Sequence, residues 1–503
     1  MNPAGGNGCT SYLQCSLAAF ALRPNATSTA TRPCSLNSSR VRWPLTKKEV
    51  DKTMSQSTAV MQPTLAAETR LPPGPAGTWR PTLQLIRNPR AALELWVKEY
   101  GDPFLLNALN GPVVVTGRED LIRTIHGQDP EIYAPFATST IVPLMGSGSM
   151  LVLEGEPHRR ERRLMMPMFH GDRLKAYGAT IQQIAMEQLD RHRARGIVST
   201  LDLMTDISLE TIVRTIFGGD NRDLTNKLVA ASRKLVRCSH PLLFFSRKSH
   251  LSFFGLSPWD RWGAAKKELF QLLDRVIADR QGSSAEHHDI LSMLCASTYD
   301  DGQSITRDHI DSELMTFLFA GHETTALSLT WSIYHLHRAQ DTLTMLRDEL
   351  DTLDELSPTQ LASAPFLKAS IHETLRIHPI ITETLRKLKS PLALDQYVIP
   401  IGTAVAPATV LAHNNPAIYP EPDTFRPDRF IGRSYSPFQY MPFGGGHRRC
   451  IGAAFASFEM AMVLGTLLKR FEFELLDTRA VVPKRRNVTV GPSSHVPIRV
   501  RAR

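Results

Sequence analysis

Residues 443–452 have the sequence FGGGHRRCIG, in which a single cysteine, Cys450, directly follows two arginines in a glycine-rich stretch. The apolar run 451–458 predicts a helix just after the cysteine, and positive groups beside a cysteine together with a helix N-terminus stabilise the thiolate over the thiol. A thiolate can bind haem iron and favours cleavage of the O–O bond. Glycines accept positive φ, so residues 444–446 can fold tightly beneath a flat macrocycle. The segment therefore predicts an iron-thiolate site with a low thiol pKa.

The alternatives to this interpretation are weaker. An isolated cysteine is usually a small buried apolar residue, and neither phosphate-binding pattern, G-x-G-x-x-G or G-x-x-x-x-G-K-[ST], is present. The spacing F-x-x-G-x-x-x-C-x-G resembles the haem signature of the cytochrome P450 family, through Phe443, Gly446, Arg448, Cys450 and Gly452. The resemblance implies haem b, bound non-covalently, with Cys450 as the iron ligand.

A second motif lies within a long apolar pattern from about 308 to 338, which would span roughly 45 Å as one helix. The hexapeptide AGHETT, residues 320–325, interrupts the pattern. A buried glutamate is costly unless it is paired or functional, and consecutive threonines can hydrogen-bond to the preceding turn and bend a helix. In the resembled family, dioxygen lies in the groove beside Ala320, and the pair Glu323 and Thr324 relays protons to it. The alternatives are a solvated kink, or a zinc motif H-E-x-x-H, which Ala326 excludes.

A third motif, Glu373-x-x-Arg376, places opposite charges at i and i+3 of a helix, which alone indicates an ordinary salt bridge. The segment FRPDRF, residues 425–430, resembles the family segment whose arginine joins this pair. The resemblance implies a three-way buried ionic lock of Glu373, Arg376 and Arg429, with a structural role.

A fourth motif places His158 and Arg162 at i and i+4, where both can reach one ligand from one helix face. The resemblance implies that these residues bind the haem propionates, with Arg448 and Arg386 as further contacts. Arginine suits carboxylates because its planar fork donates two parallel hydrogen bonds. A solvated basic helix face is the alternative.

Hydrophobic periodicity predicts a mainly α fold with a minor β-sheet portion. Helices are expected near 92–100, 117–126, 172–194, 204–217, 262–280, 308–338 and 342–354. Strands are expected within 103–116, 392–399, 403–410 and 488–500. Without a linker after Leu71, residues 61–503 are expected to form a single large domain, which the resemblance implies to have the cytochrome P450 fold.

Residues 1–60 are expected to be a disordered or processed extension, because residues 1–48 contain six basic and no acidic side chains. A later start at Met54 or Met61 is the preferred interpretation, and an organelle transit peptide is the alternative. The longest apolar run there, Cys15–Leu22, is far shorter than the ~20 residues that cross a bilayer. We therefore expect no transmembrane anchor and a soluble, cytoplasmic protein.

The net charge of +9 includes +5 from residues 1–60, seven basic against two acidic, which leaves +4 for the remainder and argues against a nucleic-acid-binding protein. Basic residues at Arg159, Arg160, Arg163 and Arg449 could attract an acidic electron donor, with a solvated surface as the alternative. The six cysteines form no C-x-x-C or C-x-x-C-H, which argues against zinc, a disulfide scaffold and covalent haem.

The resemblance implies a monooxygenase, expected to be a monomer, that inserts one atom of O2 into a small apolar substrate such as a fatty acid, alkane or terpenoid. No flavin domain follows Cys450, so electrons are expected from a ferredoxin-type donor and its reductase. Candidate pocket residues, with core packing as the alternative, are 133–151, Phe317, Ala320, Ile380 and Ile381. A haem-thiolate isomerase, dehydratase or peroxide-driven enzyme stays open, although such members often lack the acid–alcohol pair, and so does a non-catalytic haem sensor.

Overall fold

The computed structural model describes residues 70–503 apart from 219–220, 246, 282–288 and 354–355. The extension predicted for residues 1–60 lies outside this described part. Within it, no helix combines the length and apolar character that crossing a membrane requires.

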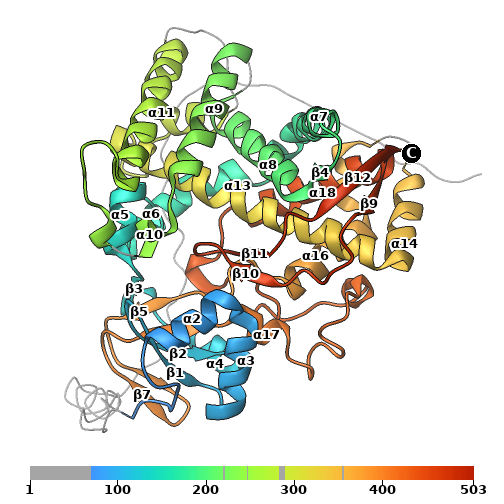
Figure 1. Cartoon of the computed structure of the whole chain (residues 1–503). Helices are drawn as coiled ribbons and strands as arrows, with labels where there is room; N and C mark the ends of the chain where they lie inside the picture. Colours follow the sequence, from blue (N-terminus) through green and yellow to red (C-terminus); the bar gives the residue numbers. More distant parts are fainter. Residues whose placement is uncertain (1–69, 219–220, 246, 282–288, 354–355) are drawn as a thin grey trace, which may run out of the picture. The chain divides into compact units, whose positions relative to one another are not determined.

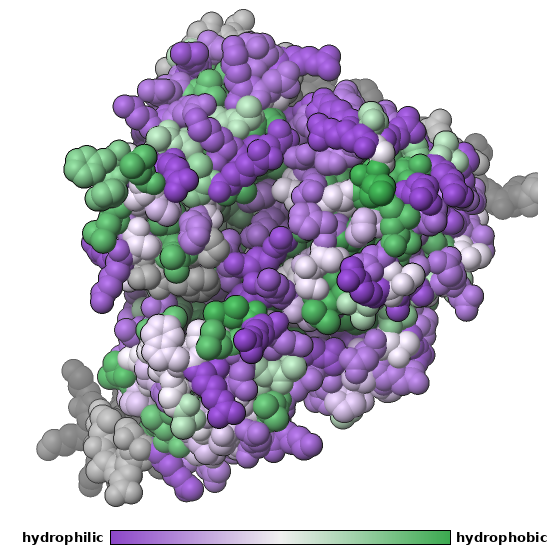
Figure 2. Space-filling view, viewed as in Figure 1, coloured by the Kyte–Doolittle hydropathy of each residue, from purple (hydrophilic) through white to green (hydrophobic). Residues whose placement is uncertain are grey.

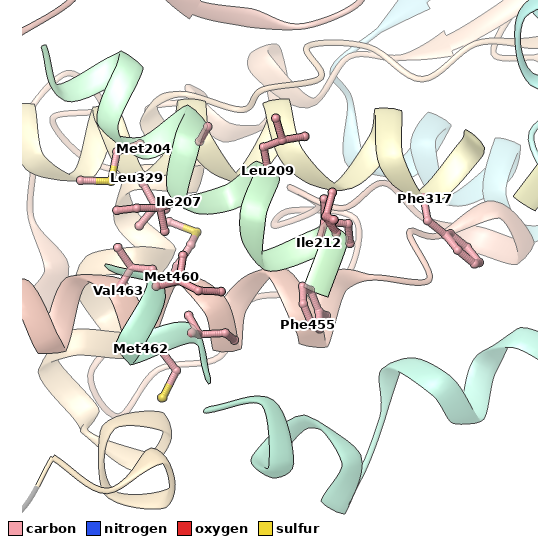
Figure 3. Close-up of a cluster of buried hydrophobic side chains, with 14 of the residues drawn as sticks. Met204, Ile207, Leu209, Ile212, Phe317, Leu329, Phe455, Met460, Met462 and Val463 are labelled. Atoms are coloured by element: carbon pink, nitrogen blue, oxygen red, sulfur yellow. The ribbon is translucent and has the colours of Figure 1, made fainter. Parts of the chain in front are cut away.

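Helix α13, Arg307–Arg338, is the long helix predicted from the apolar pattern. It is buried along most of its length, and its buried residues include polar side chains as well as apolar ones. Helix α8, Thr200–Phe217, packs along it, and α18, Ala453–Arg470, packs against both α13 and α7, Asp172–Arg193 (Figure 1). Figure 3 shows the apolar core that these helices share.

The other helices cover this core or flank the sheets. They are α2 Trp79–Arg87, α3 Pro89–Tyr100, α4 Glu119–Gly127, α5 Thr138–Met145, α6 Gly155–Met165, α9 Arg222–Cys238, α10 Pro241–Phe245, α11 Pro258–Gln281, α12 Ile290–Ala296, α14 Gln340–Asp351, α15 Pro358–Ser363, α16 Pro365–Ile377 and α17 Thr409–His413. Short 3₁₀ turns include Pro427–Phe430 and Gly446–Arg448.

Several helices begin a few residues before the predicted position, because a polar side chain caps the first turn. Helix α3 begins after Asn88, whose side chain accepts a hydrogen bond of 3.1 Å from the Ala91 N–H. Helix α8 begins after Ser199, which accepts one of 3.2 Å from the Asp202 N–H. The apolar periodicity does not include such caps, so it places the starts too late.

The main sheet has five strands in the order β1-β2-β8-β5-β3. Its strands are β1 Phe104–Ala108, β2 Gly111–Thr116, β3 Tyr133–Pro135, β5 Arg386–Leu388 and β8 Ala404–Pro407. Strands β2 and β8 are parallel, with Val114 opposite Val405, and the other pairs are antiparallel. This sheet joins residues that are almost 300 positions apart and brings Arg386 toward the Cys450 segment.

Three smaller sheets complete the fold: β6 Leu392–Leu394 with β7 Tyr397–Ile399, β10 Pro483–Arg485 with β11 Val490–Pro492, and β4 Val198–Ser199 with β12 Pro497–Ala502 and β9 Phe471–Leu475. The strand predicted for 403–410 ends at Pro407, and helix α17 follows from Thr409. The strand predicted for 488–500 is two strands in different sheets.

The face of the molecule shown in Figure 2 is mostly hydrophilic, with apolar residues gathered at its left edge. That edge corresponds to the loop between α10 and α11, where the most exposed side chains are Leu251, Phe253, Phe254 and Leu256.

Candidate functional site

The Cys450 segment is a tight loop whose shape depends on its glycines. Gly444 and Gly446 have φ values of +66° and +64°, which favour glycine, whereas Gly445 is extended. The Cys450 N–H donates a hydrogen bond of 2.9 Å to the Phe443 carbonyl and closes the loop. Helix α18 begins shortly afterwards at Ala453, so the cysteine precedes a helix N-terminus as predicted.

The thiol of Cys450 does not have the low pKa that the neighbouring arginines suggest. Burial among protein atoms raises its pKa, although the side chain is exposed on one side. The Gly452 N–H and the charges of Arg162 and Arg449 lower the pKa but do not outweigh burial. The low-pKa prediction was therefore wrong for the protein alone. A metal would change this balance, because a coordinating thiol is deprotonated outright.

Basic side chains from four parts of the chain meet beside this loop. Burial is the main cause that lowers their pKa values, and mutual repulsion adds to it. The pKa is about 3 for His158 on α6 and about 4 for His126 on α4. It is about 4 for His447 in the loop and about 10 for Arg386 on β5, and it is also lowered for Arg448.

Several donors in this basic cluster have no protein partner. One guanidinium nitrogen of Arg386, Nη2, donates to the Gly445 carbonyl at 2.6 Å, while its buried Nη1 has no hydrogen bond. Both ring nitrogens of His126 are also buried without a partner. Arg162 is half-buried, burial lowers its pKa, and it has no ion pair within the described part of the chain.

These observations test whether the residues fit haem. Buried cations and unpartnered donors are costly unless an anion compensates them. Two propionate carboxylates would compensate them, since charge-assisted hydrogen bonds from guanidinium groups to carboxylates are strong. A Cβ on Gly445 would clash with the His126 ring, so the loop also packs closely against α4. The donor set and the thiol beside it therefore fit a haem.

The middle of α13 is open on one side. Ala320 is exposed, although Phe317 and Leu318 one turn earlier are 5% and 1% exposed. The Thr324 hydroxyl donates to the Ala320 carbonyl at 2.7 Å, and Thr325 donates to the Gly321 carbonyl at 3.0 Å. This is the predicted back-bonding to the preceding turn.

Glu323 lies beside this opening and is half-buried. Its carboxylate makes no hydrogen bond or ion pair with any described residue. The Thr324 hydroxyl, whose proton is engaged, keeps its lone pairs for accepting another hydrogen bond. The two side chains that were predicted to move protons are thus both available for further hydrogen bonding.

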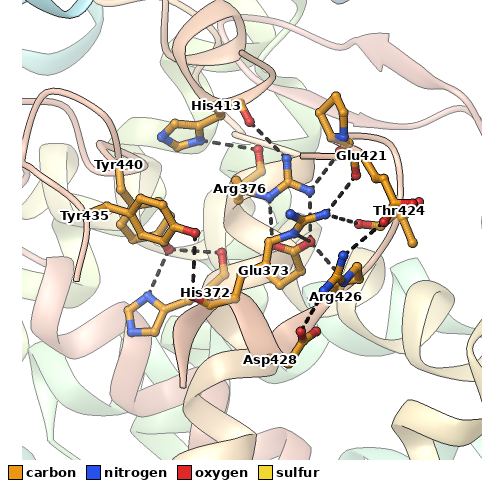
Figure 4. Close-up of polar contacts among 12 residues, drawn as sticks. His372, Glu373, Arg376, His413, Glu421, Thr424, Arg426, Asp428, Tyr435 and Tyr440 are labelled. Atoms are coloured by element: carbon orange, nitrogen blue, oxygen red, sulfur yellow. Dashed lines mark hydrogen bonds and ion pairs between the residues drawn. The ribbon is translucent and has the colours of Figure 1, made fainter. Parts of the chain in front are cut away.

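Glu373, Arg376 and Arg429 lie together with 0%, 0% and 5% of their side chains exposed. Figure 4 shows Glu373 and Arg376 among their polar partners. The Glu373 carboxylate accepts from Arg376 at 2.7 and 2.8 Å and from Arg429 at 3.2 Å. Arg376 also donates to the carbonyls of His413 and Pro422, at 2.9 and 2.8 Å. The paired charges tie α16 to the irregular segment that leads to the Cys450 loop.

Two of the candidate pocket residues are core residues in this structure. The Phe317 ring packs edge-on against Phe169 with centroids 5.0 Å apart. Ile380 is 5% exposed and packs with Leu327 and Trp331. The alternative of core packing therefore applies to both, whereas Ala320 remains accessible.

The arginines on the outer face of α6 are paired with acidic side chains, so they do not form the free basic patch that their sequence suggested. The contacts are Arg159 with Glu156 at 2.8 Å and Glu131 at 3.1 Å, Arg160 with Asp301 at 2.9 Å, and Arg163 with Glu156 at 3.0 Å.

Sequence reasoning missed His126 and His447 as members of the basic cluster. The His447 ring stacks on Tyr133 with centroids 6.4 Å apart and meets His158 edge-on at 6.0 Å. A lone histidine on an amphipathic helix, such as His126, carries no signal of its own. Only the packing of α4 on the loop shows its place.

Comparisons with known proteins agree with this geometry. The family model described as Cytochrome P450 matches residues 72–497. A Mycobacterium bovis protein named cytochrome P450 138 is 35% identical over 80% of this chain and 90% of its own length. A Mycobacterium tuberculosis protein named cytochrome P450 135B1 is 33% identical over 86% of this chain and 92% of its own length.

Solved structures show the same fold. The retinoic-acid-bound cyanobacterial protein CYP120A1 superposes with a TM-score of 0.77 at 21% identity, covering 86% of this chain and all of that one. The haem domain of cytochrome P450DA superposes with a TM-score of 0.73 at 23% identity, covering 86% of this chain and 96% of that one.

Proposed function

The chain belongs to the cytochrome P450 family, and we propose that it inserts one oxygen atom from O2 into a small apolar organic molecule. The family is one of haem-thiolate monooxygenases that bind haem b non-covalently. The observation that carries the proposal is the Cys450 thiol in a glycine-shaped loop, beside buried basic side chains with unpartnered nitrogen atoms.

The residues that would hold haem come from three parts of the chain. Cys450 would ligate the iron, and Phe443 and Gly446 would give the loop its shape. The propionates would be held by His158, Arg162, Arg386 and Arg448. Bound haem supplies an iron centre that activates dioxygen, and a thiolate ligand favours O–O cleavage.

Glu323 and Thr324 would deliver the protons that this chemistry consumes. Ala320 leaves the space in which dioxygen can lie next to Thr324. The Thr324 hydroxyl would first accept a hydrogen bond and then donate its proton after releasing the Ala320 carbonyl, from which it is 2.7 Å away. Glu323, unpaired and half-buried, would exchange protons with solvent by changing rotamer.

The substrate would be a fatty acid, an alkane or a terpenoid-like molecule. Five of the six residues of α13 directly before the opening at Ala320, 314–319, are apolar, and apolar pockets with few polar groups suit such ligands. Electrons would come from a separate ferredoxin-type protein with its reductase. We further propose that the protein is a cytoplasmic monomer and that residues 61–503 form the haem-thiolate domain.

The haem-thiolate assignment is tested by the absorption spectrum of the reduced protein with carbon monoxide. A strongly red-shifted Soret band is expected for the wild type, because a thiolate is the ligand. Cys450→Ser should abolish this band. Cys295→Ser, which changes an exposed cysteine on α12, should keep it. A thiolate-type band in Cys450→Ser would refute the ligand assignment.

The monooxygenase proposal is tested by turnover under ¹⁸O2 with a ferredoxin, its reductase and a panel of fatty acids, alkanes and terpenoids. Mass spectrometry should find one ¹⁸O atom in the product for each NAD(P)H consumed. Turnover that needs peroxide and no reductant would instead favour the peroxide-driven alternative, and isomerised product without ¹⁸O would favour the isomerase. Absence of any product with thiolate-type haem would favour the sensor.

A further inference from the structure

Residues 146–153, between α5 and α6, are attached both to α13 and to the Cys450 loop. On the α13 side, the Met150 N–H donates to Oε1 of Glu313 at 2.6 Å, and the Ser149 and Thr316 hydroxyls are 2.7 Å apart. On the loop side, Arg448 donates to the carbonyls of Met150, Leu151 and Leu153, the first two at 3.3 and 3.4 Å.

Met150 is the residue that joins the two attachments. Its N–H is held by Glu313 on α13, and its carbonyl accepts from Arg448 in the loop. The segment has little room to move, because a Cβ on Gly148 would come within 2.9 Å of the His309 Cα. A displacement of Met150 would therefore change where the Arg448 guanidinium can lie.

The Glu313 carboxyl group is buried, and only one of its two oxygens has a hydrogen-bond partner. Its side chain is 0% exposed, and its second oxygen, Oε2, has no hydrogen-bond partner. Burial raises its pKa to about 8, and the nearby charge of Glu161 on α6 adds to the rise. Glu161 in turn accepts from His309 at 2.8 Å and from Tyr299. With this raised pKa, the Glu313 carboxyl is protonated at neutral pH and still accepts the Met150 N–H through Oε1. The amide oxygen of a glutamine can accept the same hydrogen bond.

We propose that Glu313 is a positioning residue, which acts through the Met150 backbone to hold Arg448 in the orientation that meets a cofactor carboxylate. This inference rests on the role proposed above for Arg448. Glu313 itself is 0% exposed, and its one hydrogen bond is to the Met150 backbone. Its effect should therefore be seen in cofactor retention rather than in substrate binding.

The test measures how fast haem leaves the full-length holoprotein for an excess of haem-free myoglobin. Glu313→Leu should release haem about tenfold faster, the lower end of the effect expected when a ligand's supporting partner is removed. Glu313→Gln keeps the Oε1 acceptor and the volume, and it should release haem at the wild-type rate. Equal loss in the Leu and Gln variants would overturn the acceptor role.

Thr316→Val is the matched control, because it cuts the other attachment of the same segment and leaves the Glu313–Met150 bond. It should retain haem like the wild type. If it releases haem as fast as Glu313→Leu, general loosening of the segment explains the effect and the inference is overturned. Circular dichroism melts show that each variant is folded at the assay temperature.

A double-mutant cycle separates this inference from the proposal on which it rests. Arg448→Lys should itself speed haem release, and adding Glu313→Leu to it should change little, because both act through one contact. Additive effects would overturn the inference alone. No effect of Arg448→Lys would overturn both the role of Arg448 and the inference.

Discussion

Arg386 donates a 2.6 Å hydrogen bond to the carbonyl oxygen of Gly445, so strand β5 is joined directly to the loop that carries Cys450. The sheet thus positions the Cys450 loop through a side chain rather than through strand pairing. Because the second guanidinium nitrogen is buried and unpartnered, the same arginine can also bind an anion.

Replacing Arg386 should weaken haem binding more than it weakens the fold. Arg386→Met removes both the Gly445 bond and a cation for the propionates, and it should lower haem affinity about 10- to 100-fold. Lys387→Met, on the next residue of the same strand but exposed, is the control and should bind haem normally. Haem titration of the apoproteins measures both, and equal affinities would contradict the assignment.

Breaking the ionic lock should destabilise the protein strongly. Arg429→Met leaves the buried Glu373 carboxylate with one partner fewer and should cost about 3–5 kcal/mol in the free energy of unfolding. Arg426→Met, three residues earlier, removes only exposed pairs with Glu421 and Asp428 and should destabilise the protein far less. Urea unfolding followed by circular dichroism measures the difference, and similar values for both variants would argue against the lock.

Removing the Thr324 hydroxyl should uncouple NADH consumption from product formation. Thr324→Val should bind haem normally but send most reducing equivalents to hydrogen peroxide, because proton delivery is lost. Thr325→Val removes the neighbouring hydroxyl, which is buried and donates to Gly321, and should remain coupled. The ratio of product to NADH consumed is the measurement. Full coupling in Thr324→Val would exclude a proton-relay role for this residue.

Glu459 should make the protein less stable as pH rises. Burial on α18 raises its pKa to about 8 from an ordinary value of 4.5. The unfolded chain therefore loses this proton at lower pH than the folded protein, so folding stability is lost between pH 4.5 and about 8.

The variant Glu459→Gln should abolish this contribution. Its stability relative to wild type should increase from about pH 5 to 8, by up to the order of 1 kcal/mol per pH unit, and should level off above. Urea unfolding at several pH values gives this difference, and a constant difference would show that Glu459 is not the titrating group.

Features defined by short spacings were predictable from the sequence, because the spacing itself determines the geometry. The i, i+3 pair of Glu373 and Arg376 and the back-bonding of Thr324 are of this kind. The long helix α13 was predictable because its apolar pattern is long. Helix starts were placed late where a cap such as Ser199 decides them.

Properties that depend on contacts distant in the sequence could not be predicted. Arg160 pairs with Asp301, 141 residues later, a contact that the local sequence does not show. The raised pKa of the Cys450 thiol reflects desolvation, which only the folded environment determines. His126 and Glu313 carry no motif, and their surroundings depend on the packing of α4 and of residues 146–153.

Arg376 binds backbone carbonyls 37 and 46 residues further along the chain, at His413 and Pro422. The stretch between α17 and the Cys450 loop has almost no regular secondary structure. Side-chain donors therefore bond backbone carbonyls there that strand pairing would bond in a sheet. Such a stretch should resist trypsin in the native protein despite its coil-like backbone and its exposed arginines, and cleavage there would be an early sign that the lock has opened.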